Sequence, residues 1–198
     1  MRLYTLSALV AGALLASGCT TTMRAGPVDV TRYHLGNPLA PGTVKVEPVS
    51  DATTLSLEFQ SYAAAVRDGL ARQGFTPAAE GAPTDYVAAV TFVRTSRGYA
   101  RKPPPVTIGL GGGSYGSGGG VGVGGSFGIG GGRVELVSTE LRVQLKRTTD
   151  QTVVWEGRAV TDEAIGANGQ STQATAARLA EAMFKGFPGE SGITITVK

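Results

Sequence analysis

The first residues to consider for chemistry are two serines in a glycine-rich part of the chain. Ser114 and Ser126 each sit in a G-x-S-x-G pattern, which is typical of hydrolase nucleophiles. That pattern needs a strand before the serine, a helix after it and a histidine downstream. Here glycine flanks both serines, and the single histidine of the chain, His34, lies upstream of both. The abundance of glycine and serine accounts for the two matches, and neither predicts an active site.

The residue types do not predict a nucleotide-binding or a metal-binding site either. Gly111–Gly116 spells G-x-G-x-x-G, but no apolar helix follows it to receive a phosphate. With one histidine and one cysteine, a metal site would have to consist of carboxylates. The Asp and Glu residues form no cluster with the spacing of a cation-binding loop. We therefore expect a protein that is not an enzyme and holds no cofactor or metal ion.

Cys19 is the residue whose surroundings predict a chemical modification. The chain begins with the positive pair Met1-Arg2, continues with the apolar run Leu3–Leu15, and then has small residues at Ala16–Gly18. This order is typical of a cleaved export signal. The apolar run is too short for a permanent membrane helix, which takes about 20 residues. We therefore expect residues 1–18 to be removed as a signal peptide.

At Ala16–Cys19 the chain resembles the bacterial lipoproteins, whose motif is an apolar residue, two small residues and a cysteine. It departs from them at Ala16, where the family usually has leucine. The resemblance implies that Cys19 carries acyl chains and anchors the protein to a membrane. Thr20 stands where lipoproteins kept in the inner membrane often have aspartate, which favours the outer membrane. The alternative is an ordinary secreted protein with a stray cysteine beside the cleavage site.

The composition of the mature chain limits its class of partners. Without residues 1–18 the chain has 180 residues, enough for one domain with its own core. Loss of Arg2 leaves 17 basic against 15 acidic residues, a charge of about +2, which is too small to predict nucleic acid binding. We expect a lipidated N-terminus and flexible tether over residues 19–27, followed by one periplasmic domain over residues 28–198.

Two amphipathic helices are predicted from apolar residues at helical spacing. The first spans about Thr54 to Gln73, ends before Gly74, and carries an apolar face of Leu55, Phe59, Tyr62, Val66 and Leu70. The second begins after Ser171, a plausible N-cap, and ends before Phe187-Pro188-Gly189. Its apolar face consists of Ala176, Leu179, Ala180, Met183 and Phe184.

Strands are predicted where β-branched and aromatic residues gather or alternate with polar ones. They are residues 28–35, as an edge strand, then 43–47, 85–94, 134–147, 152–160 and 193–197. Within the fourth of these we expect Leu136, Leu141, Val143 and Leu145 to point inward, and the turn 149–151 joins it to the fifth as a hairpin. The order of elements suits an α+β domain: an antiparallel sheet with two helices packed on one face.

The chain also resembles a family of uncharacterised bacterial lipoproteins, the DUF4136 proteins. The residues that carry this resemblance are Asp85-Tyr86-Val87, the glycine-rich insertion, Val154–Gly157 and Phe187-Pro188, in that order. It covers about Asp29 to Lys198. The family implies an envelope lipoprotein with an α+β domain and no known catalytic residues, and it brings no substrate.

The insertion over residues 103–133 is the least ordinary stretch of the chain. Glycine makes up 15 of the 24 residues from 109 to 132, and residues 103–132 include no charged side chain. Such a segment buries too little area to offset its backbone entropy, which favours disorder or a loose hairpin. Against this, an extended chain would place Val121, Val123, Phe127 and Ile129 on one face.

Basic residues flank the insertion on both sides. Arg94, Arg97, Arg101 and Lys102 precede it, and Arg133 follows it. Cations at the base of an uncharged loop favour contact with anionic lipid head groups. The alternative is that these cations are the solvated faces of two strand ends. We expect the insertion to contact a membrane or a second copy of the chain. We also expect the domain to contact an unidentified envelope protein.

Overall fold

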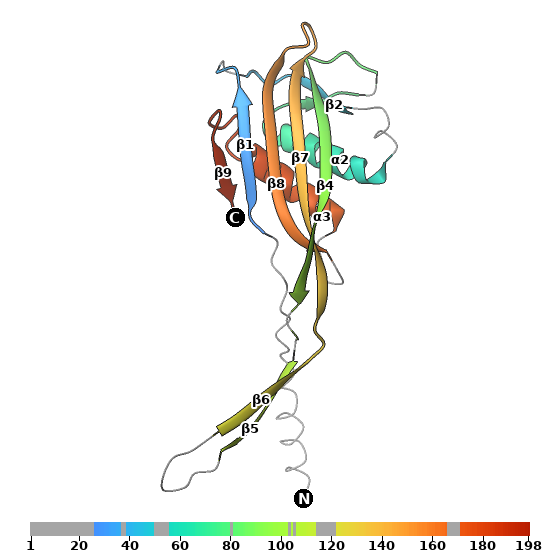
Figure 1. Ribbon diagram of the computed structural model, residues 1–198. Helices are drawn as coiled ribbons and strands as arrows, with labels where there is room; N and C mark the ends of the chain where they lie inside the picture. The colour runs from blue at the N-terminus through green and yellow to red at the C-terminus, as the bar shows by residue number, and fades with distance from the viewer. Residues whose placement is uncertain are drawn as a thin grey trace, which may run out of the picture.

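The computed structural model describes residues 26–36, 39–49, 56–79, 81–102, 104, 106–113, 122–165 and 171–198 (Figure 1). The predicted signal peptide, Cys19 and the tether up to residue 25 lie outside these residues. Among the described helices, none has the length and apolar character needed to cross a membrane.

Both predicted helices form, and each starts at a serine that caps its first turn. Helix α2 spans Leu57–Arg72, and the Ser56 side chain accepts a hydrogen bond from the Phe59 backbone N–H. Helix α3 spans Thr172–Phe184, with Ser171 in the same role toward Ala174. The predicted apolar faces are buried, with Leu55 lying outside the described residues. Gly74 takes a φ of +91° just after α2, as a residue that ends a helix in the left-handed region does.

Seven strands form the main sheet, in the order β3-β2-β4-β7-β8-β1-β9. Most neighbours run antiparallel, as predicted, but β2 pairs in parallel with both β3 and β4. The bounds are Val28–His34 for β1, Thr43–Pro48 for β2, Thr76–Pro77 for β3, Tyr86–Lys102 for β4, Gly132–Arg147 for β7, Val153–Ile165 for β8 and Thr194–Val197 for β9. A separate ribbon of two strands, β5 (Val106–Gly113) and β6 (Gly122–Ile129), lies between β4 and β7 in the sequence.

Two predictions about the strands are wrong. Strand β1 is not an edge strand, because it pairs with β8 on one side and with β9 on the other. Leu136 does not share the inward face of Leu141, Val143 and Leu145, and it is only half-buried. Side chains alternate along a strand, and an even-numbered residue of β7 faces away from the odd-numbered ones.

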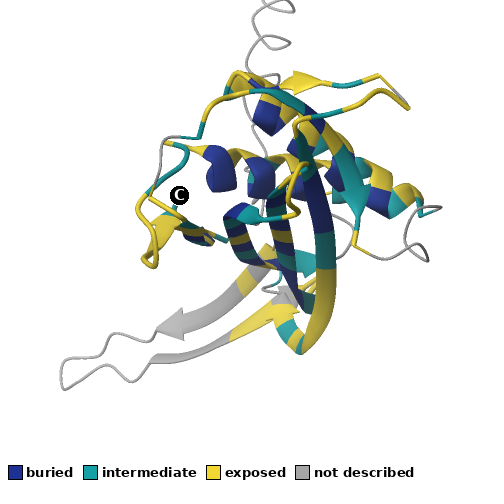
Figure 2. Cartoon of the chain, turned by 90° about the horizontal axis from the view of Figure 1, so that it is seen from above, coloured by how far each residue is buried: buried dark blue, intermediate teal, exposed yellow. Residues whose placement is uncertain are grey.

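The core lies between the helices and one face of the sheet, and Figure 2 shows the buried residues gathered there. Tyr62 of α2 stacks on Phe92 of β4 with ring centroids 4.4 Å apart. Trp155 of β8 stacks on Phe184 of α3 at 5.6 Å. The two helices approach so closely that a Cβ added to Gly69 would lie 2.4 Å from the Phe184 ring. This tight contact is what a single α+β core of two layers requires.

The Tyr62 hydroxyl gives the core a testable pH dependence. This fully buried oxygen has no hydrogen-bond partner among the described residues, and burial raises the pKa of Tyr62 to about 12. We expect Tyr62→Phe to be neutral or to stabilise the fold by up to about 1 kcal/mol at pH 7. The matched control is Tyr86→Phe, which removes a hydroxyl bonded to the Ala40 carbonyl at 3.1 Å and should cost about 1 kcal/mol.

The same tyrosine should weaken the native chain in alkali. The folded pKa of Tyr62 lies above the unfolded value, so between about pH 10 and 12 the unfolded chain loses a phenol proton that the folded chain retains. The free energy of unfolding therefore does not depend on this group below about pH 10 and falls as pH rises towards 12. Urea unfolding from pH 8 to 12 should show the native chain losing about 1–2 kcal/mol more than the Tyr62→Phe variant. Equal losses in the two proteins would contradict the assignment.

Candidate functional site

The most distinctive feature of the molecule is an arm that leaves the main sheet. Strand β8 ends at Ile165, opposite Glu135 of β7. Beyond that point the β4–β7 ladder continues to the pair Lys102 and Gly132, without a third strand among the described residues. The ribbon β5–β6 follows, and Figure 1 shows it extending away from the helices. We call the described residues between 98 and 136 the arm.

A β-bulge marks the start of the arm. Ser96 pairs with Val137 and Gly98 with Leu136, which leaves Arg97 as the extra residue of β4. Gly98 has a φ of +97°, a conformation that glycine adopts readily. Bulges increase the local twist and bend of a strand pair, which turns the arm out of the plane of the sheet. Arg97 donates a hydrogen bond to Ser138 Oγ at 3.4 Å, so its side chain is held back against the sheet.

Four apolar side chains lie together on one face of the ribbon. Val106 pairs with Ile129 and Ile108 with Phe127, and direct cross-strand partners share a face. Their exposed fractions are 51% for Val106, 46% for Ile108, 64% for Phe127 and 57% for Ile129. The positions of the opposite face carry small residues, with Gly109 paired to Ser126 and Gly111 to Gly124. The ribbon is therefore amphipathic, and its apolar face has no cover within the described chain.

The structure confirms that Phe127 and Ile129 share a face, as predicted. Val123 pairs with Gly112 in the backbone, while its side chain and the whole of Val121 lie outside the described residues. Sequence reasoning missed Val106 and Ile108, which come from the other strand. The signal was present as two β-branched residues separated by one position, just before the glycines.

Two of the predicted basic residues come together at the base of the arm. Arg101 and Arg133 are direct cross-strand partners, both exposed, and Tyr99 and Glu135 form the next pair on the same face toward the sheet. Among the described ion pairs, neither arginine has a carboxylate partner within 4 Å. A shallow hollow beside them is lined by Tyr99, Ala100, Arg101, Pro104, Gly131, Gly132 and Arg133. Like charges directly opposite one another are unfavourable, so this pair favours an external anion.

The remaining predicted cations are placed differently. Arg94 belongs to the body of the domain, because it forms an ion pair with Glu58 of α2 at 2.9 Å. The backbone of Lys102 pairs with Gly132 at the base of the arm, and its side chain is outside the described residues. Among the described side chains, Arg101 and Arg133 are therefore the two predicted flanking cations that come together at the surface.

A buried polar cluster holds the point where the chain enters the domain, close to the same end of the sheet. Arg178 of α3 donates to the Gly26 carbonyl, to Glu163 and, at 3.0 Å, to Thr161 Oγ1. Thr161 donates to the Pro27 carbonyl at 3.0 Å, and Thr175 donates to Glu163 at 2.6 Å. We call this cluster the tether clamp, because it fixes residues 26–27, the last before β1.

Sequence reasoning did not identify the tether clamp, although one signal for it exists. Trp155, Gly157, Ala159 and Thr161 occupy the inward positions of β8, and Glu163 continues that series with an exposed fraction of 7%. A carboxylate at an inward position of a strand needs a buried partner. The partner is Arg178 of α3, and the local sequence pattern does not indicate that this helix packs beside β8.

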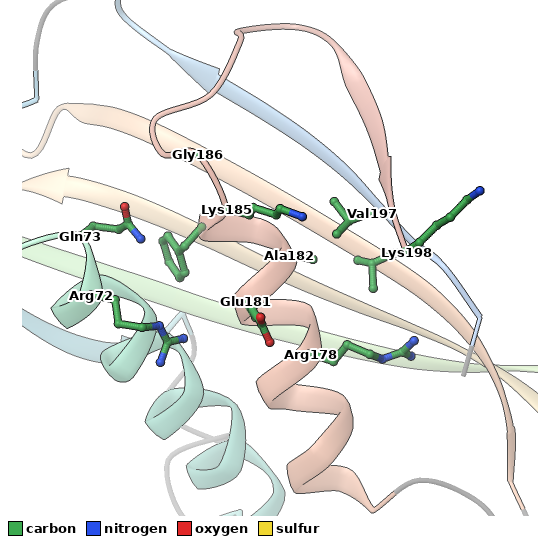
Figure 3. A pocket seen from close by; sticks show the side chains of 11 residues that line it. Arg72, Gln73, Arg178, Glu181, Ala182, Lys185, Gly186, Val197 and Lys198 are labelled. Carbon is green, nitrogen blue, oxygen red and sulfur yellow. The ribbon is translucent and has the colours of Figure 1, made fainter. Parts of the chain in front are cut away.

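An open groove lies beside the tether clamp, between the ends of the two helices and β9 (Figure 3). Its volume is about 350 Å³, and its lining includes Arg72, Arg178, Lys185, Lys198 and Glu181 around the apolar residues Val28, Phe184 and Val197. In Figure 3 Lys198 points away from Arg72, so the labelled cations do not converge on one point. Arg178 is moreover engaged in the tether clamp. The groove offers a positive rim and no preformed pocket for one charged group.

The sheet face opposite the helices is a second open surface. Glu140 accepts hydrogen bonds from Arg158 at 2.7 Å and Arg142 at 2.8 Å, and these bonds, Arg158 first, hold the pKa of Glu140 below its usual range. Val49 and Val93, both exposed, line a shallow hollow of about 260 Å³ on this face with Glu140 and Arg142. Mixed polar and apolar character of this kind is shared by ordinary protein surfaces and by non-obligate interfaces.

The residues considered for catalysis are not brought together. Ser126 is exposed on the ribbon, and Ser114 lies outside the described residues. His34 is the last residue of β1, and the first residue of that strand, Val28, is the one nearer the arm. The Nε2 atom of His34 lies 3.1 Å from the Gly189 carbonyl oxygen. Within the described ranges, no group of His, Cys, Asp and Glu side chains has the geometry to hold a metal ion.

Comparison with known proteins places the chain in a family. An uncharacterised protein of Zymomonas mobilis subsp. mobilis is 34% identical, over 87% of this chain and 80% of its own length. A PDZ domain protein from Parabacteroides distasonis matches with a TM-score of 0.47 and 9% identity, over 87% of this chain but only 39% of that protein. The PelC dodecamer of Paraburkholderia phytofirmans matches with a TM-score of 0.39 and 13% identity, over 79% of this chain and 93% of that one.

The family itself is identified by residues 41–189, which match the domain of unknown function DUF4136. Two groups of residues that carried the sequence resemblance are in direct contact, because Trp155 Nε1 donates to the Pro188 carbonyl at 3.0 Å. The matched range includes the whole arm and the helix α3 of the tether clamp. The chain belongs to the DUF4136 family.

Proposed function

We propose that the protein is a non-catalytic envelope lipoprotein, held at the outer membrane by acyl chains on Cys19 and acting there as a periplasmic interaction module. The observation that carries the proposal is the position of the chain entry. Val28 pairs with Thr161 near the end of β8 from which the arm departs, so the tether and the arm leave the domain at one end. The chain therefore enters the fold at Gly26 on the side from which the arm leaves.

The length of the tether supports a close approach of this end to the membrane. Six residues lie between Cys19 and Gly26, so seven steps from one Cα to the next join them. Seven fully extended steps span at most about 25 Å. The sheet face opposite the helices lies along the body of the domain, and it is free to contact proteins of the periplasm. An interaction module needs such an open face, and the tether clamp fixes the point at which the chain enters the domain.

Substitution of the anchor residue tests the proposal. The native protein isolated from membranes should have a mass that begins at Cys19 plus acyl chains, and it should partition into the detergent phase of Triton X-114. We expect Cys19→Ser to lack the acyl mass, because no thiol is left for lipidation. Thr20→Ser is the matched control and should keep both properties. An unmodified native chain in the aqueous phase would refute the anchor.

A second function is favoured by the arm itself. Both outer edges of β5 and β6 are unpaired among the described residues, and such edges can pair with another chain. The glycine-rich segment 109–132 would then build an assembly of lipoprotein copies at the membrane. Limited trypsin digestion separates this case from a monomer. Assembled arms should resist cleavage at Arg101 and Arg133, whereas separate arms should be cut at both within minutes.

A further inference from the structure

We propose that the apolar face of the arm lies in the interfacial layer of the membrane that holds the anchor, with Arg101 and Arg133 at the level of anionic head groups. The inference rests on the proposed lipid anchor for its geometry. Its own basis is the order of residues along the arm, the reach of the tether and the charge of the arm.

The order of residues from the sheet outward follows the layers of a membrane surface. On one face of the arm, the exposed aromatic Tyr99 pairs with Glu135, and the next pair outward on that face is Arg101 with Arg133. The apolar pairs Val106–Ile129 and Ile108–Phe127 come after these. Aromatic and basic side chains prefer the head-group layer, and apolar side chains prefer the layer beneath it.

The reach of the tether matches the position of the apolar pairs. Gly26 lies against Asp162, one residue from Glu163, and Glu163 pairs with Val137. Eight positions along the chain separate Val137 of β7 from Ile129 of β6, which gives at most about 26 Å at 3.3 Å per residue, because residues 130–131 between the two strands are not extended as a strand is. The chain from Cys19 to Gly26 spans at most about 25 Å. A domain anchored through Cys19 can therefore bring its apolar pairs to the membrane surface, because the arm extends about as far from the domain as the tether can.

The backbone of the ribbon limits how deeply it enters. A ribbon of two strands has two unpaired edges, and its outer N–H and C=O groups would be unsatisfied within hydrocarbon. At the interface, water and head groups satisfy these edges. The ribbon therefore lies along the surface, with the four apolar side chains toward the acyl chains and the glycine positions toward water.

Charge decides between a bilayer and a second copy as the occupant of the apolar face. A second copy facing the first would bring another Arg101–Arg133 pair to the same contact, and each arm has one carboxylate on that face, Glu135, against its two arginines. Anionic head groups neutralise both arginines and leave the apolar face to the acyl chains.

The test places a fluorescent reporter on each face of the ribbon in the lipidated full chain. Phe127→Trp reports on the apolar face, and Ser126→Trp, one residue away on the opposite face, is the matched control. The native protein supplies the background, because its one tryptophan, Trp155, is only 1% exposed. The proteins are reconstituted into vesicles of phosphatidylethanolamine and phosphatidylglycerol, with and without brominated acyl chains.

We expect brominated lipid to reduce the added emission of Phe127→Trp about twofold or more and to leave that of Ser126→Trp nearly unchanged. Adding Arg101→Gln and Arg133→Gln to the Phe127→Trp protein should raise its emission in brominated vesicles toward the value in vesicles without bromine. Equal quenching of the two reporters, or none in either, would overturn the membrane contact.

The design separates failure of the arm from failure of the anchor. A lipidated protein that stays on the vesicles with an unquenched Phe127→Trp overturns the inference and keeps the anchor. Selective quenching in a chain whose mass shows no acyl groups supports the arm and overturns the anchor. Protein that does not bind the vesicles overturns both. Protection of Phe127→Trp by contact between copies, seen as cross-linked dimers and no bromine quenching, assigns the face to a second copy.

Discussion

Replacing Arg32 by methionine is expected to destabilise the domain by about 3–5 kcal/mol. The Arg32 side chain is 4% exposed, and it caps the end of α3. It donates to the carbonyls of Met183 at 2.8 Å, Ala182 at 3.0 Å and Lys185 at 2.9 Å. Burial lowers the pKa of Arg32, but an arginine keeps its charge in proteins, so the carbonyl end of the helix balances a permanent cation. Methionine fills the volume and leaves three carbonyls without their donor.

Two further substitutions make this prediction specific. Arg32→Lys keeps the charge, but its single ammonium group cannot reproduce the planar guanidinium, and we expect an intermediate loss of about 1–3 kcal/mol. Arg158→Met is the matched control on the open face of the sheet, where an exposed ion pair with Glu140 is worth about 1 kcal/mol or less. Urea unfolding measures all three. A loss for Arg32→Met no larger than that for Arg158→Met would contradict the capping role.

Replacing Trp155 by alanine is expected to cost about 3–5 kcal/mol as well. Its ring stacks on Phe184, lies 5.2 Å from Phe187 and donates to the Pro188 carbonyl. The alanine variant loses these contacts and leaves a large cavity between β8 and α3. A Cβ added at the neighbouring Gly157 would lie 2.3 Å from the Trp155 ring, so this glycine exists to admit the indole.

The conservative change separates the two contributions of Trp155. Trp155→Phe keeps an aromatic ring in the stack and removes only the indole donor and part of the volume, so we expect a loss of about 1–2 kcal/mol. Thermal unfolding of the three proteins gives the comparison. A Trp155→Phe variant as unstable as Trp155→Ala would assign the stability to the bond with Pro188 and not to the stacking.

The elements that the sequence predicted well are those whose signals are local. The spacing of Phe59, Tyr62, Val66 and Leu70 defines one face of α2, and the cap at Ser171 begins α3. The hairpin of β7 and β8 follows from two alternating segments joined by a short turn. The α+β class follows from the order of these elements.

What the sequence could not supply is pairing between distant segments. The parallel pairing of β2 with β4 and the position of β1 between β8 and β9 depend on partners far along the chain. For the same reason Arg32 reads as an ordinary polar residue of a strand, although its partners lie about 150 residues further on. In the arm, alternation predicted the shared face of Phe127 and Ile129, but only the register brings Ile108 beside them.

The position of β1 also decides how the domain bears a mechanical load. A pull on the anchor enters the fold at Gly26 and acts along the axis of β1. The seven residue pairs with β8 and the four pairs with β9 are then strained in shear, all at the same time, and do not separate one after another. The tether thus joins the fold where β1 is loaded along its length and not across it. When the membrane moves relative to a protein bound to the domain, we therefore expect the tether to extend before β1 leaves the sheet.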